Sequence, residues 1–167
     1  MTQYRLSQEA KYLTQLYNNC ANDLYHFLLT MSAPALAEDI TQRTWLKVID
    51  NRNKYQVDGT FTGWLFTIGR RLLIDELRKQ NRWVELEEAT LADAQTTIES
   101  GNRSLMRDFD STLSQLPFLQ REAFILRQEG FGIQEICHIT SSNTEAVKSR
   151  LRYAKNSLRQ ALGKYHD

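Results

Sequence analysis

The sequence has little of what several fold classes require: its 167 residues include two cysteines, two prolines and seven glycines. Cys20 and Cys137 stand far apart, which predicts neither a disulfide framework nor a metal site and favours a reducing, cytoplasmic location. Few glycines and prolines exclude a protein of many tight turns and favour helices. The longest stretch without Asp, Glu, Lys or Arg, 24–37, is too short to cross a bilayer and contains Pro34. The N-terminus lacks the apolar core of a signal peptide.

The residue groups that most enzymes need are also missing from the sequence. His26, His138 and His166 are isolated from one another and from other metal-ligating residues. The segment "GFGIQE" lacks the third glycine of a dinucleotide-binding loop, and no Gly-Lys-Ser/Thr run cradles a phosphate. We therefore expect no catalysis, no cofactor and no small-molecule substrate.

Charge is distributed unevenly, although the net charge is only +1. Residues 1–83 carry 11 Lys/Arg against 8 Asp/Glu, and residues 103–167 carry 10 against 7. Residues 84–102 carry five acids and no base. Between Glu145 and Asp167 there are six cations and no carboxylate. The sequence therefore consists of two mildly basic parts that flank an acidic strip.

Apolar periodicity predicts three helices in the first part. Leu13, Leu16, Cys20, Leu24 and Leu28 recur at helical spacing. Pro34 suits the first turn of a second helix, which fades in the polar segment 50–59, and a third helix runs from about Phe61 to Lys79.

The second part reads as four helices. Pro117 stops the first, and Gly130 suits the C-terminal cap of the second. A short helix near 133–138 and a long final helix follow. We predict an all-α fold of two small helical domains, a three-to-four-helix bundle over 1–83 and a helix-turn-helix domain over 104–167, joined by a flexible acidic linker over 84–103.

The final helix has a start signal and a basic strip. Ser142 and Glu145 match the capping-box pattern, which makes Ser142 the predicted N-cap. The predicted buried stripe, in chain order, is Val147, Leu151, Ala154, Leu158 and Ala161 or Leu162. Lys148, Arg152, Lys155 and Arg159 follow the same rhythm one position later, and Arg150 lies on the other flank.

A short helix, a short turn and a longer helix have the spacing of a helix-turn-helix, whose second helix enters the major groove. The alternative is an amphipathic C-terminal helix with a solvated basic face. Helix-end electrostatics accounts for Arg159 and Lys164 in that case, because cations complement a helix C-terminus. It does not account for Lys148, Arg150 and Arg152, which lie in the N-terminal half.

The segment "EGFGIQEICHITSSNTEAVKSRLRYAKNSL" resembles the C-terminal helix-turn-helix of bacterial sigma factors of the extracytoplasmic-function group, most specifically in "VKSRL". "LSQLPFLQREAFILRQEGF" resembles the helices that precede it in that family. In the first part, "AEDITQRTWLKVI" is similar to the family's polymerase-binding helix and "FTGWLFTIGRRLLIDELRK" to its promoter-melting helix. The resemblance covers roughly residues 8–165.

The resemblance implies a protein that performs no chemistry but docks on core RNA polymerase and directs it to promoter DNA. In the family, the N-terminal domain grips a coiled coil of the largest polymerase subunit and captures a flipped base of the minus-ten element. The C-terminal domain reads the minus-thirty-five element as duplex. An anti-sigma factor is a usual partner, although no residue of this sequence indicates one.

The residues that the resemblance assigns fall into three groups. The expected minus-thirty-five contacts are Asn143, Thr144, Glu145, Lys148, Ser149, Arg150, Arg152, Tyr153 and Lys155. The expected minus-ten contacts are Trp64, Arg70, Arg71, Arg78, Lys79, Asn81 and Arg82. The expected core-polymerase contacts are Asp39, Gln42, Arg43, Trp45 and Leu46.

Several of these assignments have alternatives. The alternative for Trp45 and Leu46 is that they belong to the domain core, which for Trp45 is as consistent as a polymerase contact. Trp64 is more simply explained by burial between helices than by base stacking. The acidic strip fits either a basic polymerase channel or a solvated linker.

The sequence also departs from the family's pattern. Arg43, Arg71 and Tyr153 stand where an acid, an Asn and an Arg are common, while Gly132 and Ser141 replace a Ser/Thr and a Gly. These departures leave the fold intact and put the promoter bases and some polymerase contacts in doubt.

The main competing function is an autonomous helix-turn-helix repressor or activator. Such a protein would bind duplex operator DNA alone, at two half-sites one helical turn apart. A single helix-turn-helix beside a promoter-melting type of helix favours the sigma factor.

Overall fold

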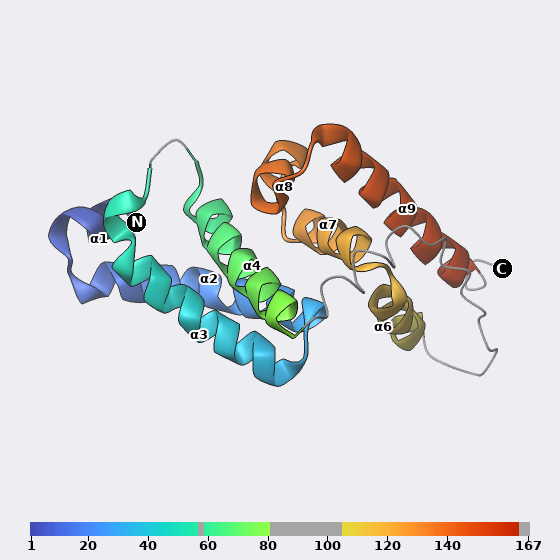
Figure 1. Cartoon of the computed structure of the whole chain (residues 1–167), viewed down its shortest axis with the longest axis horizontal. Helices are drawn as coiled ribbons and strands as arrows, with labels where there is room; N and C mark the ends of the chain where they lie inside the picture. The colour runs from blue at the N-terminus through green and yellow to red at the C-terminus, as the bar shows by residue number, and fades with distance from the viewer. Residues whose placement is uncertain (57–58, 81–104, 164–167) are drawn as a thin grey trace.

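In the computed structural model, residues 1–56, 59–80 and 105–163 are described. They form eight α-helices and one short 3-10 helix, arranged as two lobes that lie side by side (Figure 1). No helix within these ranges is both long and apolar enough to cross a membrane. The predicted all-α fold is confirmed, and the predicted linker falls outside the described residues.

The N-terminal lobe is built from α2, α3 and α4, which pack against one another. In chain order its elements are α1 (Thr2–Ser7), α2 (Ala10–Met31), α3 (Pro34–Asp50), the 3-10 helix η1 (Arg52–Lys54) and α4 (Phe61–Lys79). Pro34 occupies the first turn of α3, and Thr60 caps α4 by accepting a hydrogen bond of 3.1 Å from the Gly63 N–H. The short helix α1 was not predicted, because six residues are too few to show a periodic pattern.

The C-terminal lobe places its last helix across the others. Its elements are α6 (Leu105–Gln115), α7 (Phe118–Gln128), α8 (Ile133–Thr140) and α9 (Thr144–Leu162), with α9 packed on α6, α7 and α8. Gly130 has φ 96°, a left-handed conformation just past the end of α7 that glycine adopts without steric cost. The C-cap itself is Glu129, one residue before the predicted Gly130, and Gly130 is the left-handed residue that follows it.

The two lobes share a contact that the sequence did not predict. Helix α4 packs against α8, and α2 packs against α7. At the centre of the contact, the rings of Phe66 and Phe131 meet edge to face with centroids 4.9 Å apart. Thr60 donates to Glu135 over 3.3 Å and His26 lies 3.5 Å from Glu129 at the margin. Buried apolar side chains therefore run from one lobe into the other.

Gly69 allows α4 to approach α2 and α3 closely. A Cβ atom at this position would lie 2.9 Å from Leu24 Cδ1 and 3.3 Å from Thr44 Oγ1, and both side chains are fully buried. Overpacking of this kind costs about 1–3 kcal/mol, and the better helix propensity of alanine offsets about 1 kcal/mol of that cost. We therefore expect Gly69→Ala to lower the free energy of unfolding by about 1 kcal/mol in urea titrations.

Gly163→Ala is the matched control for that substitution, because no atom lies within 4 Å of a Cβ built there. A Gly69→Ala protein as stable as the parent would show that the three helices can separate slightly without loss of packing energy.

Candidate nucleic-acid interface

Helices α8 and α9 and the turn between them form the predicted helix-turn-helix. The side chain of Glu135 accepts a 2.9 Å hydrogen bond from the Gly132 N–H and so caps the start of α8. Ser141 has φ 52° and reverses the chain after α8. The buried side of α9 consists of Val147, Leu151, Ala154, Leu158 and Ala161, as the predicted stripe requires.

The predicted N-cap of α9 was wrong by one residue. Asn143 is the cap, since its Oδ1 accepts a 2.8 Å hydrogen bond from the Ala146 N–H. The Ser142 hydroxyl instead accepts a 2.7 Å hydrogen bond from Arg150 Nη1, two turns further along α9. It also donates a 3.3 Å hydrogen bond to the Thr140 carbonyl. Asn and Ser are equally good N-caps, so the sequence pattern alone could not separate the two adjacent positions.

One face of α9 carries exposed cations beside the buried stripe. Lys148, Arg152 and Lys155 are all exposed. Lys148 Nζ lies 3.7 Å from Glu145 in an exposed pair, and the Arg152 guanidinium lies 5.3 Å from the centroid of the Tyr153 ring. Exposed pairs of this kind contribute little, so these side chains remain available to a polyanion. Of the other predicted contacts on α9 and its cap, Asn143 and Tyr153 are exposed and Thr144 and Ser149 are half-buried.

The predicted minus-ten residues of α4 occupy three different environments. Trp64 is half-buried and packs edge to face against Tyr55, with ring centroids 5.2 Å apart. Arg71 and Arg78 line a cleft between the lobes. Lys79 is exposed near the end of the helix, 4.0 Å from Glu76. Asn81 and Arg82 lie outside the described residues.

Arg70 is held in an ion pair that joins the lobes. Its Nε lies 2.6 Å from Glu122 Oε1 and its Nη2 lies 3.1 Å from Oε2, a two-pronged contact with α7. The Glu122 side chain has no exposed surface and that of Arg70 is 11% exposed. Arg70 is therefore not accessible to DNA in this arrangement.

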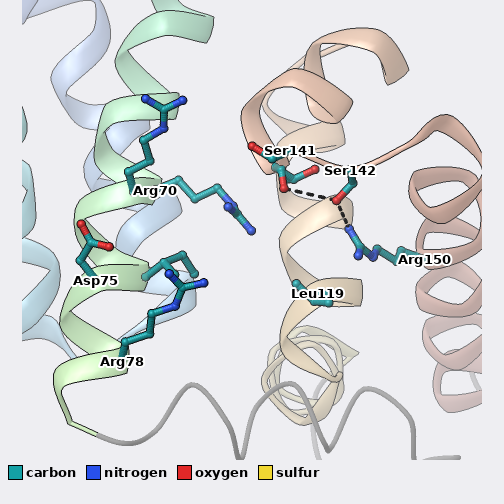
Figure 2. Close-up of a pocket in the computed structure, with 10 residues that line it drawn as sticks. Arg70, Asp75, Arg78, Leu119, Ser141, Ser142 and Arg150 are labelled. Carbon is teal, nitrogen blue, oxygen red and sulfur yellow. Dashed lines mark hydrogen bonds between the residues drawn. The ribbon is translucent and has the colours of Figure 1, made fainter.

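Arg150 differs from its neighbours on α9 because it points toward the other lobe (Figure 2). Burial lowers the pKa of its guanidinium; Glu122 acts in the opposite direction and Arg70 in the same direction. Arg70 and Arg150 thus come from different lobes and share the field of one buried carboxylate.

The predicted polymerase-binding residues of α3 separate into a surface and a core residue. Asp39, Gln42 and Leu46 are exposed, and Leu46 is 61% exposed despite its apolar side chain. Arg43 reaches from Asp39 at 3.2 Å to Glu76 at 3.5 Å. Trp45 is only 6% exposed and packs on Tyr17 with ring centroids 5.1 Å apart. Trp45 therefore belongs to the domain core, as the alternative interpretation held, and Leu46 does not.

Glu122 is the residue that sequence reasoning missed. Its signal was its position, four residues after Phe118 and four before Leu126, on the apolar side of α7. A carboxylate at such a place must be paired, because an isolated buried charge is very costly. Its partner, Arg70, lies in the other lobe and 52 positions earlier in the chain, which no local pattern indicates.

Two family models match the chain and together cover both lobes. The model for sigma-70 region 2 matches residues 16–83, and the model for sigma-70 region 4 matches residues 106–158. The RNA polymerase sigma factor CarQ of Myxococcus xanthus is 35% identical over 77% of this chain and 76% of that protein. The ECF RNA polymerase sigma factor EcfG of Rhodopseudomonas palustris is 31% identical over 81% of this chain and 77% of that protein.

Solved structures show the same fold. The sigma factor RpoE of Bartonella quintana, in complex with the anti-sigma factor NepR, superposes with a TM-score of 0.73 at 28% identity and covers 92% of this chain and 98% of that one. CnrH, in complex with the cytosolic domain of CnrY, has a TM-score of 0.66 at 20% identity, with 98% and 94% covered. The order of the two regions, the curated relatives and the shared fold agree, and the chain belongs to the extracytoplasmic-function group of RNA polymerase sigma factors.

Proposed function

We propose that the two lobes divide the work of promoter recognition in the way that the sequence predicted. The observation that carries this proposal is the exposed strip of Lys148, Arg152 and Lys155 on the second helix of a helix-turn-helix. Such a strip suits the phosphates that flank a major groove, while the first turn of α9, from Asn143 to Glu145, faces base edges. The lobe of residues 104–167 then binds the minus-thirty-five element.

The N-terminal lobe, residues 1–83, would bind core polymerase and the minus-ten element. The exposed face of Asp39, Gln42 and Leu46 on α3 combines polar groups with an apolar side chain that is 61% exposed, which suits a helical protein partner such as the largest-subunit coiled coil. Trp45 supports this face from the core. Arg71, Arg78 and Lys79 provide cations along α4 for a separated strand.

The arrangement of the lobes adds a condition to DNA binding. Arg70 is bound to Glu122 and Arg150 points into the cleft between the lobes, so neither can meet promoter DNA while the lobes are in contact. We propose that the lobes separate when the protein joins polymerase. Glu122→Ala, which removes the ion pair between the lobes, tests that step.

The other partners and properties follow from the family. We propose that the protein acts in the cytoplasm, performs no catalysis itself, and is inhibited by an anti-sigma factor, as the complex of its Bartonella quintana relative suggests. Inhibition of reconstituted transcription by a candidate anti-sigma factor, relieved by excess of this chain, is the measurement for that partner.

Reconstitution with core polymerase tests the main proposal. We expect promoter-specific transcripts from chain plus core polymerase, and permanganate-reactive thymines at the minus-ten element only when both are present. The chain alone should not open DNA, because its α4 cations are partly engaged at the lobe contact. Stable opening by the isolated chain, or tight binding to a two-half-site operator, would instead favour the autonomous regulator.

A further inference from the structure

The cleft between the lobes gathers four arginines from two helices. Arg70, Arg71 and Arg78 come from α4. Figure 2 shows Arg150 reaching from α9, on the side opposite Arg70 and Arg78. The cleft has a volume of about 320 Å³, which is within the range of small-ligand sites. It is therefore large enough for a small anion and is built by both lobes.

Among the described residues, one carboxylate lines the cleft and one lies buried beside it. The acid that lines the cleft within the described ranges is Asp75, and the buried Glu122 is already bound by Arg70 through both of its oxygens. Arg71 is exposed and makes no hydrogen bond or ion pair with any other residue in the described ranges. Arg71 and Arg150 thus carry positive charge on opposite sides of the cleft, and an anion between them would lower their mutual repulsion.

The groups that line the cleft indicate the chemistry of that anion. Guanidinium groups form two parallel hydrogen bonds with phosphate oxygens, which ammonium groups cannot do. The hydroxyls of Ser141 and Ser142 add neutral polar groups on the α8–α9 side. Ile74 and Leu119 contribute an apolar part of the wall. A ligand with two or more phosphate groups matches the arginines from both sides.

We propose that the cleft between the lobes is a binding site for a small phosphate-rich anion, either an inorganic polyphosphate or a nucleotide, that bridges α4 and α9. The bound anion neutralises Arg71 and Arg150 together and so holds the lobes in contact. Its effect on transcription rests on the proposed function: the occupied cleft withdraws arginines that promoter DNA would otherwise meet.

Titration calorimetry of the full chain tests the site, with inorganic phosphate, tripolyphosphate and ATP as probes at fixed salt. We expect tripolyphosphate and ATP to bind with one-to-one stoichiometry and inorganic phosphate to bind much more weakly. Arg71→Gln and Arg150→Gln should each weaken tripolyphosphate binding about tenfold or more, because each removes a charge-assisted contact. Arg159→Gln, an exposed cation on α9 away from the cleft, is the matched control and should change binding less than about twofold.

The two possible sources of phosphate are separated by the same titrations. ATP that binds more tightly than tripolyphosphate identifies a nucleotide site, in which Ile74 and Leu119 contact the base, and equal affinities identify a polyphosphate site. Weakening by only one of the two arginine substitutions would overturn the proposal, because a bridging ligand requires both. The absence of saturable binding by tripolyphosphate and ATP would overturn it as well.

Thermal melting without ligand controls for folding of each variant. If Arg150→Gln melts early, because it loses the hydrogen bond to Ser142, Arg150→Lys replaces it. Lysine keeps the charge but not the planar fork, so we still expect weaker tripolyphosphate binding. Full affinity in a folded Arg150→Lys protein, or full affinity in Arg71→Gln, would contradict a bridging site.

Discussion

The double substitution Lys148→Ala and Arg152→Ala should strongly reduce promoter-specific transcription by the reconstituted polymerase. Both side chains are exposed, one turn apart on the face of α9 that lies beside its buried stripe. A single phosphate contact contributes roughly tenfold to DNA affinity at about 0.1 M salt through counterion release. We therefore expect up to about a hundredfold weaker promoter binding by the holoenzyme, and a salt slope reduced by about two.

Arg159→Ala is the matched control, because it removes a cation from the same helix about two turns further on. Arg159→Ala should retain most of the promoter-specific transcription if the N-terminal half of α9 makes the DNA contacts. The affinity of the double variant for core polymerase should also be unchanged. Full transcription by a folded double variant would show that the basic strip is only a solvated helix face.

The parts of the fold that could be predicted are those determined by local sequence. The buried stripe of α9 was predicted because the helical period determines which side chains share a face, and an apolar face of this length is buried against other helices. Pro34 and Gly130 likewise marked boundaries through their own backbone restrictions. The one-residue error at the start of α9 arose where two competent caps, Ser142 and Asn143, are adjacent.

The lobe contact could not be predicted, because its partners are far apart in sequence and each looks ordinary in its own helix. Phe66 lies on α4 and Phe131 follows α7, and their rings contact each other across the lobes. Leu46 shows the opposite case. The sequence left Leu46 open between a polymerase contact and the domain core, and it is 61% exposed because α2 and α4 cover another side of α3.

The sequence predicted which residues carry the charge of the candidate site, but not which of them are exposed to a ligand. The cations on α9 and α4 were identified from spacing and from the family resemblance, but their environments differ. Lys148 is in solvent, Arg150 points into the cleft and Arg70 is bound to a buried acid. Helical period gives the direction of a side chain relative to its own axis, and a second lobe then decides whether that direction leads to solvent.

Glu122→Ala should open the contact between the lobes. The substitution removes both carboxylate oxygens from Arg70 and leaves that guanidinium in a buried place, near the like charge of Arg150. Breaking a buried ion pair on one side costs about 3–5 kcal/mol when the remaining charge stays buried. Here the protein can avoid that cost by separating its lobes, because Arg70 and Glu122 belong to different lobes and water can then reach the arginine.

Small-angle X-ray scattering measures this opening directly. A compact chain of this length has a radius of gyration of about 15 Å, and we expect a clearly larger value for Glu122→Ala together with unchanged helix content by circular dichroism. Glu38→Gln, an exposed acid on α3, is the control and should scatter like the parent. Arg70→Ala should also open the lobes, since it leaves Glu122 buried and unpaired. The variant that carries both Glu122→Ala and Arg70→Ala should lose less free energy of unfolding than the two single variants combined. Unchanged scattering in both single variants would mean that the apolar contact of Phe66 with Phe131 holds the lobes without the ion pair, and that Arg70 is not released in this way.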